Sequence, residues 1–198
     1  IEGLARACEA LGIPVVSGNV SLYNETDGRA IDPTPVVGCV GLVPDVRVVP
    51  RAWEPGDVVL LARVGDVALD GSEYQARLLG GPAGRPPPPQ YPAEAALIDF
   101  LWRSAPLLSA AHDASAGGVA VAFAELALWS GVGAELDLED DAVTWFGEGG
   151  GQAAIACPRE WVEELEGFAF REIGVVGGDR LLGVGLDALR SAYFGATA

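Results

Sequence analysis

The chain has 198 residues, half of them hydrophobic and a fifth charged, so it can bury a substantial core. Its formal net charge is −16, with 28 acidic residues against 12 basic ones, all arginine. This balance argues against nucleic acid or an anionic membrane surface as a partner. There is no signal-peptide pattern, and Glu125 interrupts the longest apolar stretch, 117–134. We therefore expect a cytoplasmic protein.

The three cysteines, Cys8, Cys39 and Cys157, are widely spaced and form no C-x-x-C pair. We interpret them as structural thiols in a reducing compartment, with a disulfide or a metal site as the alternative.

Residues 1–50 are predicted to be the end of one domain. Helical spacing of apolar residues predicts a helix that Gly12 ends. Apolar runs predict short buried strands at 14–16 and 36–43, and residues 25–28 read as a turn. Because the sequence begins at Ile1 inside this helix, we expect a C-terminal portion of a longer protein.

The loop after the first predicted strand carries the chemistry of a ligand site. Gly18 lets a ligand approach the backbone closely, and the carbonyl oxygen of Asn19 is a hard ligand of the kind that Mg²⁺ takes. The hydroxyl of Ser21 can bond a phosphate or an amide. A simple Ser-Gly-Asn turn without a ligand is the alternative, and we interpret Asn24 and Glu25 as turn residues.

Residues 51–198 are predicted to form an α/β domain, a mixed sheet flanked by helices. A turn at 53–57 opens it, and the proline-rich segment 80–92 is expected to be a surface loop. We expect strands at 58–62, 107–111, 135–138, 153–157 and 168–176, a hairpin-like turn at 179–180, and helices at 73–79, 93–104, 119–129, 159–165 and 186–194, with Ser72 as the N-cap of the first helix and Pro158 at the first position of the fourth.

Two segments of this domain have both a structural and a functional interpretation. Gly71 and Ser72 could hold a phosphate, but a helix cap explains them better. His112, the only histidine, precedes the glycine pair Gly117-Gly118, which could form an anion-binding helix N-terminus. We favour a structural histidine at a strand-to-helix turn over an acid/base or phosphate-contacting one.

The glycine-rich run 146–152 resembles a phosphate loop but lacks the Gly-Lys-Ser/Thr ending, so we interpret it as a flexible loop. The acidic run 137–141 is expected to be a solvated turn, because the regular alternation of oxygen ligands in a Ca²⁺ site is absent.

Four ordered blocks carry a family resemblance along nearly the whole chain: residues 16–25 followed by 33–38, then 70–74, 112–118 and 146–148. On these blocks the chain resembles the synthetase-subunit family of phosphoribosylformylglycinamidine synthase. The resemblance implies the C-terminal domain of the aminoimidazole ribonucleotide synthetase-like superfamily, preceded by the tail of an ATP-binding domain. It also implies an ATP-dependent, amidine-forming ligase of purine biosynthesis that uses ammonia from glutamine.

The same resemblance implies that Gly18 contacts ATP, that Asn19 binds Mg²⁺ and that Ser21 contacts the ribonucleotide substrate. It implies no catalytic residue in this chain, and a glutaminase subunit and a small bridging subunit as partners. The chain departs from the family's pattern at Asp70, where a glycine is usual, at Ala116, where an acidic residue is usual, and near Gln152, where an arginine is common.

Two alternatives stay open. One is another synthetase or kinase of the same ATP-binding superfamily, against which the block around Gly18 and Asn19 argues. The other is a catalytically inactive α/β domain that serves only as a subunit interface.

Overall fold

The computed structural model describes residues 1–21, 23–32, 34–81 and 83–195, and the chain divides into two compact units, Ile1–Arg47 and Val48–Ala198. Leu22 and Pro33, which belong to the first sequence block, and Pro82, in the proline-rich segment, lie outside the described residues. The predicted domain boundary after residue 50 is close to the division between the units, and it stays a prediction.

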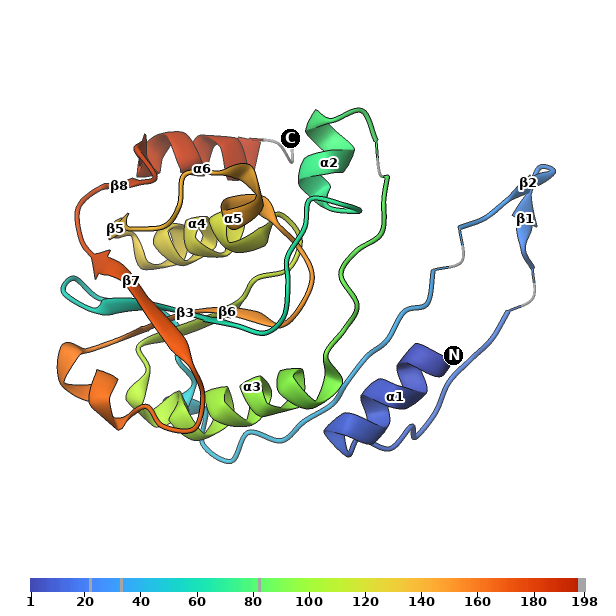
Figure 1. The fold of residues 1–198 in the computed structure, drawn as a ribbon, viewed down its shortest axis with the longest axis horizontal. Coiled ribbons are helices and arrows are strands. Elements are labelled where there is room, and N and C mark those ends of the chain that lie inside the picture. Colours follow the sequence, from blue (N-terminus) through green and yellow to red (C-terminus); the bar gives the residue numbers. More distant parts are fainter. Residues whose placement is uncertain (22, 33, 82, 196–198) are drawn as a thin grey trace. The chain divides into compact units, whose positions relative to one another are not determined.

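The first unit contains one helix and one small hairpin (Figure 1). Helix α1 (Glu2–Leu11) ends as predicted at Gly12, whose φ of 64° is left-handed. Strands β1 (Glu25–Thr26) and β2 (Arg29–Ala30) pair through the turn Asp27-Gly28, whose φ angles of 51° and 72° are those of a two-residue hairpin turn. The predicted helix and turn are therefore confirmed.

The two predicted buried strands of the first unit are wrong for this structure. The described residues of 14–16 and 36–43 form neither strand nor helix, and their valines are exposed, Val16 by 89% and Val40 by 101%. A strand needs a neighbour to pair its backbone N–H and C=O groups, and β1 and β2 pair only with each other. Cys39, on the second of these segments, is exposed as well.

The second unit is built on a seven-stranded sheet with the order β4-β6-β3-β7-β5-β8-β9. All its neighbouring pairs are antiparallel except β5 and β8, which are parallel. The predicted mixed sheet is thus confirmed. Its strands are β3 (Val58–Arg63), β4 (Ala110–Asp113), β5 (Ala134–Leu136), β6 (Gln152–Cys157), β7 (Phe170–Val176), β8 (Arg180–Leu181) and β9 (Val184–Gly185).

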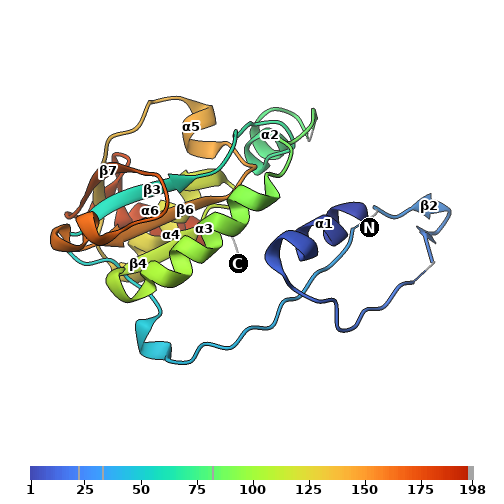
Figure 2. The same ribbon diagram turned by 60° about the horizontal axis from the view of Figure 1, so that its bottom comes forward.

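Helices cover both faces of this sheet, with α3 on one face and α4, α5 and α6 on the other (Figures 1 and 2). The helices are α2 (Glu73–Leu78), α3 (Tyr91–Ser104), α4 (Gly118–Ser130), α5 (Ala142–Phe146) and α6 (Leu186–Gly195), and three 3₁₀ turns are η1 (Val46–Val48), η2 (Ala105–Leu107) and η3 (Arg159–Glu164). Among the described residues, no helix has both the length and the apolar character that crossing a membrane requires.

Alternation along the central strands divides the core in two. Val59 and Leu61 of β3 face the layer of α4, with Phe123 at its centre, whereas Leu60 faces Phe100 of α3. Because both faces are covered, β3 is a continuous apolar run, which is why the sequence pattern located it correctly. Each buried aromatic side chain contributes about 1.5–3 kcal/mol of transfer free energy.

Three predicted elements differ from those observed. The strand expected at 107–111 is β4 at Ala110–Asp113, because the 3₁₀ turn η2, with Pro106 in its middle, occupies Ala105–Leu107 before it. The helix expected at 159–165 is the 3₁₀ turn η3, with Pro158 as its N-cap. The turn expected at 179–180 lies at Leu182 and Gly183, which join β8 to β9 with φ angles of 48° and 77°.

Candidate functional site

Three of the four sequence blocks meet at one edge of the second unit. The N-terminus of α2 supplies the block 70–74, the connection from β4 to α4 supplies 112–118, and the end of α5 supplies 146–148. The rings of Tyr74 and Phe146 lie 5.1 Å apart between centroids. Residues distant in the chain are thereby brought into contact.

Helix α2 begins as the sequence predicts. The hydroxyl of Ser72 accepts a hydrogen bond from the Gln75 N–H at 3.1 Å and donates to the Leu69 carbonyl at 2.5 Å. The Gln75 side-chain carbonyl accepts from the N–H groups of Gly71 and Ala83, at 2.8 and 2.9 Å. The cap interpretation is confirmed, and the proline-rich segment is tied to the start of α2.

Glu148 is the residue that joins the three blocks. Its Oε1 accepts hydrogen bonds from the Glu73 N–H at 2.8 Å and from the Gly117 N–H at 2.7 Å. Its backbone pairs in both directions with Ala68, at 2.9 and 3.0 Å. A carboxylate of the protein thus accepts from one N–H group at the start of each of α2 and α4, where a phosphate could otherwise bind.

The glycine run after α5 is packed, so the prediction of a flexible loop is wrong. A Cβ on Gly150, whose φ is +59°, would lie 2.1 Å from the Val64 carbonyl oxygen, and a Cβ on Gly149 would lie 2.8 Å from Cδ of Pro87. The Val64 N–H donates to the Gly151 carbonyl at 2.7 Å. Glycine is required here because the turn lies directly against neighbouring backbone.

His112 lies at the end of β4, at the strand-to-helix turn that the sequence predicted. Its ring stacks on Trp129 with centroids 4.9 Å apart, and Nδ1 lies 2.6 Å from the Asp113 carbonyl oxygen. Its Nε2 lies 3.1 Å from Oε2 of Glu125, and Oε1 of the same carboxylate accepts from the Tyr193 hydroxyl at 2.9 Å. Trp129 and Glu125 of α4 thus lie against the imidazole of β4, and Tyr193 of α6 binds the same Glu125.

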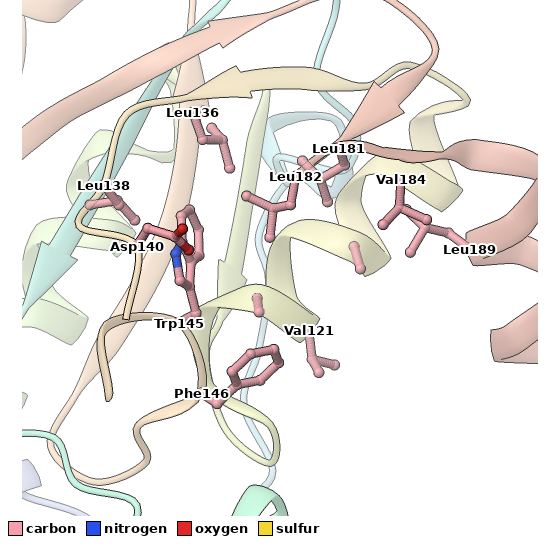
Figure 3. Close-up of a pocket in the computed structure, with 12 residues that line it drawn as sticks. Val121, Leu136, Leu138, Asp140, Trp145, Phe146, Leu181, Leu182, Val184 and Leu189 are labelled. Atoms are coloured by element: carbon pink, nitrogen blue, oxygen red, sulfur yellow. The ribbon is translucent and has the colours of Figure 1, made fainter. Parts of the chain in front are cut away.

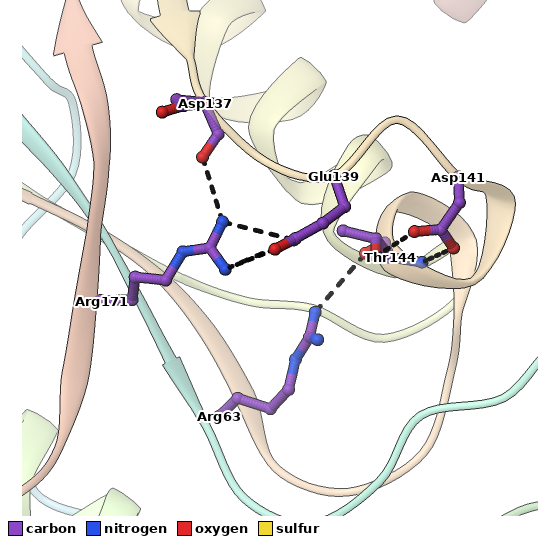
Figure 4. Close-up of polar contacts among 6 residues, drawn as sticks. All are labelled: Arg63, Asp137, Glu139, Asp141, Thr144 and Arg171. Carbon is purple, nitrogen blue, oxygen red and sulfur yellow. Dashed lines mark hydrogen bonds and ion pairs between the residues drawn. The ribbon is translucent and has the colours of Figure 1, made fainter.

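The acidic residues of the run 137–141 are exposed to solvent, as predicted, and several of them also make polar contacts within the chain (Figure 4). Glu139 pairs with the Arg171 guanidinium at 3.3 Å, and Arg171 also donates to the Asp137 carbonyl at 3.1 Å. Asp141 caps α5 through the N–H groups of Val143 and Thr144, at 2.9 and 3.0 Å. Helix α5 was not predicted, although an acidic residue before a short apolar run is a typical helix start.

Arg63, at the end of β3, is a polar residue that sequence reasoning missed. Its Nε donates to the buried side chain of Gln152 at 2.9 Å, and Nη2 lies 3.5 Å from the Thr144 carbonyl (Figure 4). Burial is the main cause that lowers the pKa of this guanidinium, and the nearby Arg171 charge adds to it. Gln152 is thus a buried amide that binds Arg63 through its oxygen and the Gly147 carbonyl through its nitrogen.

An apolar cavity of about 640 Å³ lies between α4, α5, α6 and the β8–β9 hairpin (Figure 3). Asp140 and the indole of Trp145 are the polar groups on one wall, and leucines, valines, alanines and Phe146 form the others. A second cavity, of about 620 Å³, is lined by residues of all three sequence blocks, among them Tyr74 and Gly117. Val121 and Phe146 line both cavities.

The predicted ligand loop lies in the first unit. Gly18, Asn19 and Ser21 are exposed, and none of them makes a hydrogen bond with another described residue. Asn19 offers one oxygen ligand, and no group of three His, Cys, Asp or Glu residues among those described could hold a metal ion. The donor set fits Mg²⁺ only with further oxygens from a bound phosphate or from other segments.

The fold and these loops define the chain as a helix-flanked mixed α/β domain joined to a helix-and-loop segment. The family described as AIR synthase related protein, C-terminal domain, matches residues 54–187, and the N-terminal domain of the same family matches residues 1–43. The chain belongs to the AIR synthase related protein family.

Curated relatives match nearly the whole length of this chain. The phosphoribosylformylglycinamidine synthase subunit PurL of Thermobifida fusca is 42% identical over 97% of this chain and 28% of its own length. PurL of Parasynechococcus marenigrum is 46% identical over 88% of this chain and 26% of its own length. The chain therefore spans little more than a quarter of the relatives that it matches.

Solved structures agree with the fold. Thermotoga maritima PurL complexed with FGAR superposes on 72% of this chain and 29% of its own, with a TM-score of 0.58 at 19% identity. The complex of the same protein with ATP covers 72% and 27%, with a TM-score of 0.51 at 18% identity. At this identity the likeness shows the fold alone.

Proposed function

We propose that this chain is the C-terminal portion of the synthetase subunit of a phosphoribosylformylglycinamidine synthase. The observation that carries the proposal is the 42% identity to PurL over 97% of the chain. In this reading residues 1–50 are the end of an ATP-binding domain and residues 51–198 form the C-terminal domain. The reaction is the ATP-dependent conversion of formylglycinamide ribonucleotide and ammonia to the amidine, in purine biosynthesis in the cytoplasm.

Three residues of the first unit would serve this reaction. Gly18 has no atom within 4 Å of the position of a Cβ, so its backbone is open to the phosphates of ATP. The Asn19 carbonyl oxygen would hold one Mg²⁺ position, and the Ser21 hydroxyl would donate to the ribonucleotide. Bound Mg·ATP supplies the phosphoryl group that converts the substrate amide oxygen into a leaving group. The loop's task is to hold and orient these reactants.

The exposed valines of segments 14–16 and 36–43 support the proposal that both segments pair with further strands. Both segments are apolar on both faces, which is typical of strands inside a sheet. Only residues 1–43 match the N-terminal domain of the family. We propose that the rest of that domain, in a longer polypeptide, supplies the neighbours of these segments.

The partners in this proposal are a glutaminase subunit, which releases ammonia, and a small bridging subunit. Support comes from the solved Thermotoga maritima assembly called PurLQS, which has a TM-score of 0.50 to this chain at 18% identity.

The test is ammonia-dependent amidine synthesis by the complete polypeptide that carries these residues, with Asn19→Ala and the matched control Asn24→Ala. We expect the parent and the Asn24 variant to be active. We expect a large loss in the Asn19 variant, relieved in part by excess Mg²⁺. The isolated chain should form no product, and product from it would overturn this assignment of roles.

Other outcomes separate the alternatives. Activity that survives Asn19→Ala would keep the reaction but remove Asn19 from the metal site. An inactive parent, with the glutaminase partner present, would favour another synthetase or kinase of the superfamily or a non-catalytic interface domain. Protection of residues 18–21 from hydrogen exchange by Mg·ATP would count against the interface domain.

A further inference from the structure

The cavity of about 620 Å³ at the junction of α2, α4, α5 and α6 has the size of a small-molecule site. None of Gly18, Asn19 and Ser21 lines it. Its lining residues are Glu73, Tyr74, Arg77, Leu78, Ala116, Gly117, Val121, Phe146, Ala192 and Tyr193. They combine aromatic rings, small apolar side chains and one pair of opposite charges.

Aromatic rings from three helices form the walls. Tyr74 of α2 and Phe146 of α5 lie 5.1 Å apart between ring centroids, with their planes tilted by 32°. Tyr193 of α6 adds a third ring, which its hydroxyl anchors through the 2.9 Å hydrogen bond to Glu125. Walls of this kind favour a flat ring, which gains contact on its face and its edge.

Arg77 is the only basic side chain among the described residues that line the cavity, in a chain with 28 acidic residues and 12 basic ones. Its Nε donates to Oε2 of Glu73 at 2.6 Å, and the two side chains are 78% and 46% exposed. An exposed pair at this spacing on a helix is weak. A ligand carboxylate can therefore take the guanidinium, which binds such groups through two parallel hydrogen bonds.

The helix N-termini beside the cavity do not offer a competing anion site. The Glu148 carboxylate already accepts from the N–H groups of Gly117 and Glu73, at 2.7 and 2.8 Å. A second anion at that position would meet this negative charge. An anionic ligand in the cavity is thus directed to Arg77 and away from the backbone.

We propose that this cavity binds a small planar aromatic carboxylate, with its ring against the aromatic wall that Tyr74, Phe146 and Tyr193 form and its carboxylate on Arg77. Ala116 is exposed and lines the cavity. Its small side chain leaves room for the ring, and it adds no negative charge that would repel the carboxylate.

The test uses 2-naphthoate as the probe, titrated by calorimetry into the 198-residue chain at pH 7. 2-Naphthol, which has the same ring without the charge, and acetate, which has the charge without the ring, are the matched ligands. We expect 2-naphthoate to bind at least about tenfold more tightly than either, since one lost charge-assisted contact commonly changes affinity by that factor.

The variants locate the site. Arg77→Gln should weaken 2-naphthoate about tenfold and leave 2-naphthol unchanged. Arg103→Gln is the matched control, because Arg103 also pairs with an acid four residues away, Asp99, on the exposed face of α3. Glu73→Gln should strengthen binding by releasing Arg77, and Ala116→Phe should abolish it by filling the cavity. Unchanged tryptophan fluorescence checks that each variant is folded.

Three results would overturn the proposal. These are equal binding of 2-naphthoate and 2-naphthol, binding of 2-naphthoate that survives Arg77→Gln or Ala116→Phe, and tighter binding of the cation 2-naphthylmethylammonium. The last result would assign recognition to Glu73. Because none of these ligands depends on ATP or on amidine synthesis, the outcome is independent of the proposed function.

Discussion

The carboxylate of Glu148 lies 2.7 Å from the backbone N–H of Gly117, 31 residues earlier in the chain. The same oxygen accepts from the N–H of Glu73, 75 residues away. One side chain therefore holds the starts of α2 and α4 against the end of α5. Its carboxylate takes the position at these helix starts where a bound phosphate would otherwise accept hydrogen bonds.

Replacing Glu148 with alanine should destabilise the second unit by about 2 kcal/mol, because two backbone donors lose a charged acceptor. Glu148→Gln keeps an acceptor oxygen without the charge and should cost less. The measurement is urea unfolding followed by tryptophan fluorescence, which reports on the second unit because all five tryptophans lie in it. Equal stability of Glu148→Ala and the parent would show that the two hydrogen bonds contribute nothing.

The glycine turn after α5 is packed against neighbouring backbone, so we expect its stability to depend on glycine at position 150. Gly150→Ala should destabilise the second unit by about 2 kcal/mol or more, because the new Cβ meets the Val64 carbonyl and the φ of +59° is strained for alanine. Gly177→Ala is the control: its Cβ meets no atom within 4 Å, so its effect should stay within about 0.5 kcal/mol. Similar small losses in both variants would restore the flexible-loop interpretation.

We expect the stability of the second unit to depend on the ionisation of Asp141 at acidic pH. The hydrogen bond from the Thr144 hydroxyl, and then that from the Thr144 N–H, hold the pKa of this carboxyl below its ordinary value of 3.8. Because the folded pKa is the lower one, the stabilisation is present above about pH 4 and is lost as the pH falls through the depressed pKa.

Asp141→Asn tests this dependence, because asparagine also caps helices but does not titrate. The difference in urea midpoint between the parent and this variant should shrink between pH 6 and pH 2.5. Asp140→Asn, at the neighbouring position outside the cap, is the control. A midpoint difference that stays constant across this range would contradict the role of the ionised cap.

The cysteines should differ in reactivity. Cys157 is buried on β6, and burial, followed by the nearby Asp57 charge, raises the pKa of its thiol to about 11. Cys39 is exposed and Cys8 is half-buried. With iodoacetamide at pH 8, we expect alkylation of Cys39 and Cys8 and none of Cys157 until urea is added, measured by peptide mass spectrometry. Early labelling of Cys157 would show that β6 opens in the native state.

The sequence by itself located the features that short-range chemistry controls. Gly12 ends α1, Ser72 starts α2, and the apolar run of β3 marks a strand covered on both faces. Each depends on residues within one or two turns of chain, so periodicity and capping rules suffice. The same ordered blocks also pointed to the family that the matches to residues 1–43 and 54–187 show.

Only the tertiary structure decided what those blocks do in this fold. Whether Gly117 meets an external anion or Glu148, and whether the glycine run is loose or packed, depends on contacts between distant segments. The predicted strands at 14–16 and 36–43 were wrong here for the same reason. An apolar run shows that a segment can be buried, whereas a strand forms only where a second backbone pairs with its N–H and C=O groups.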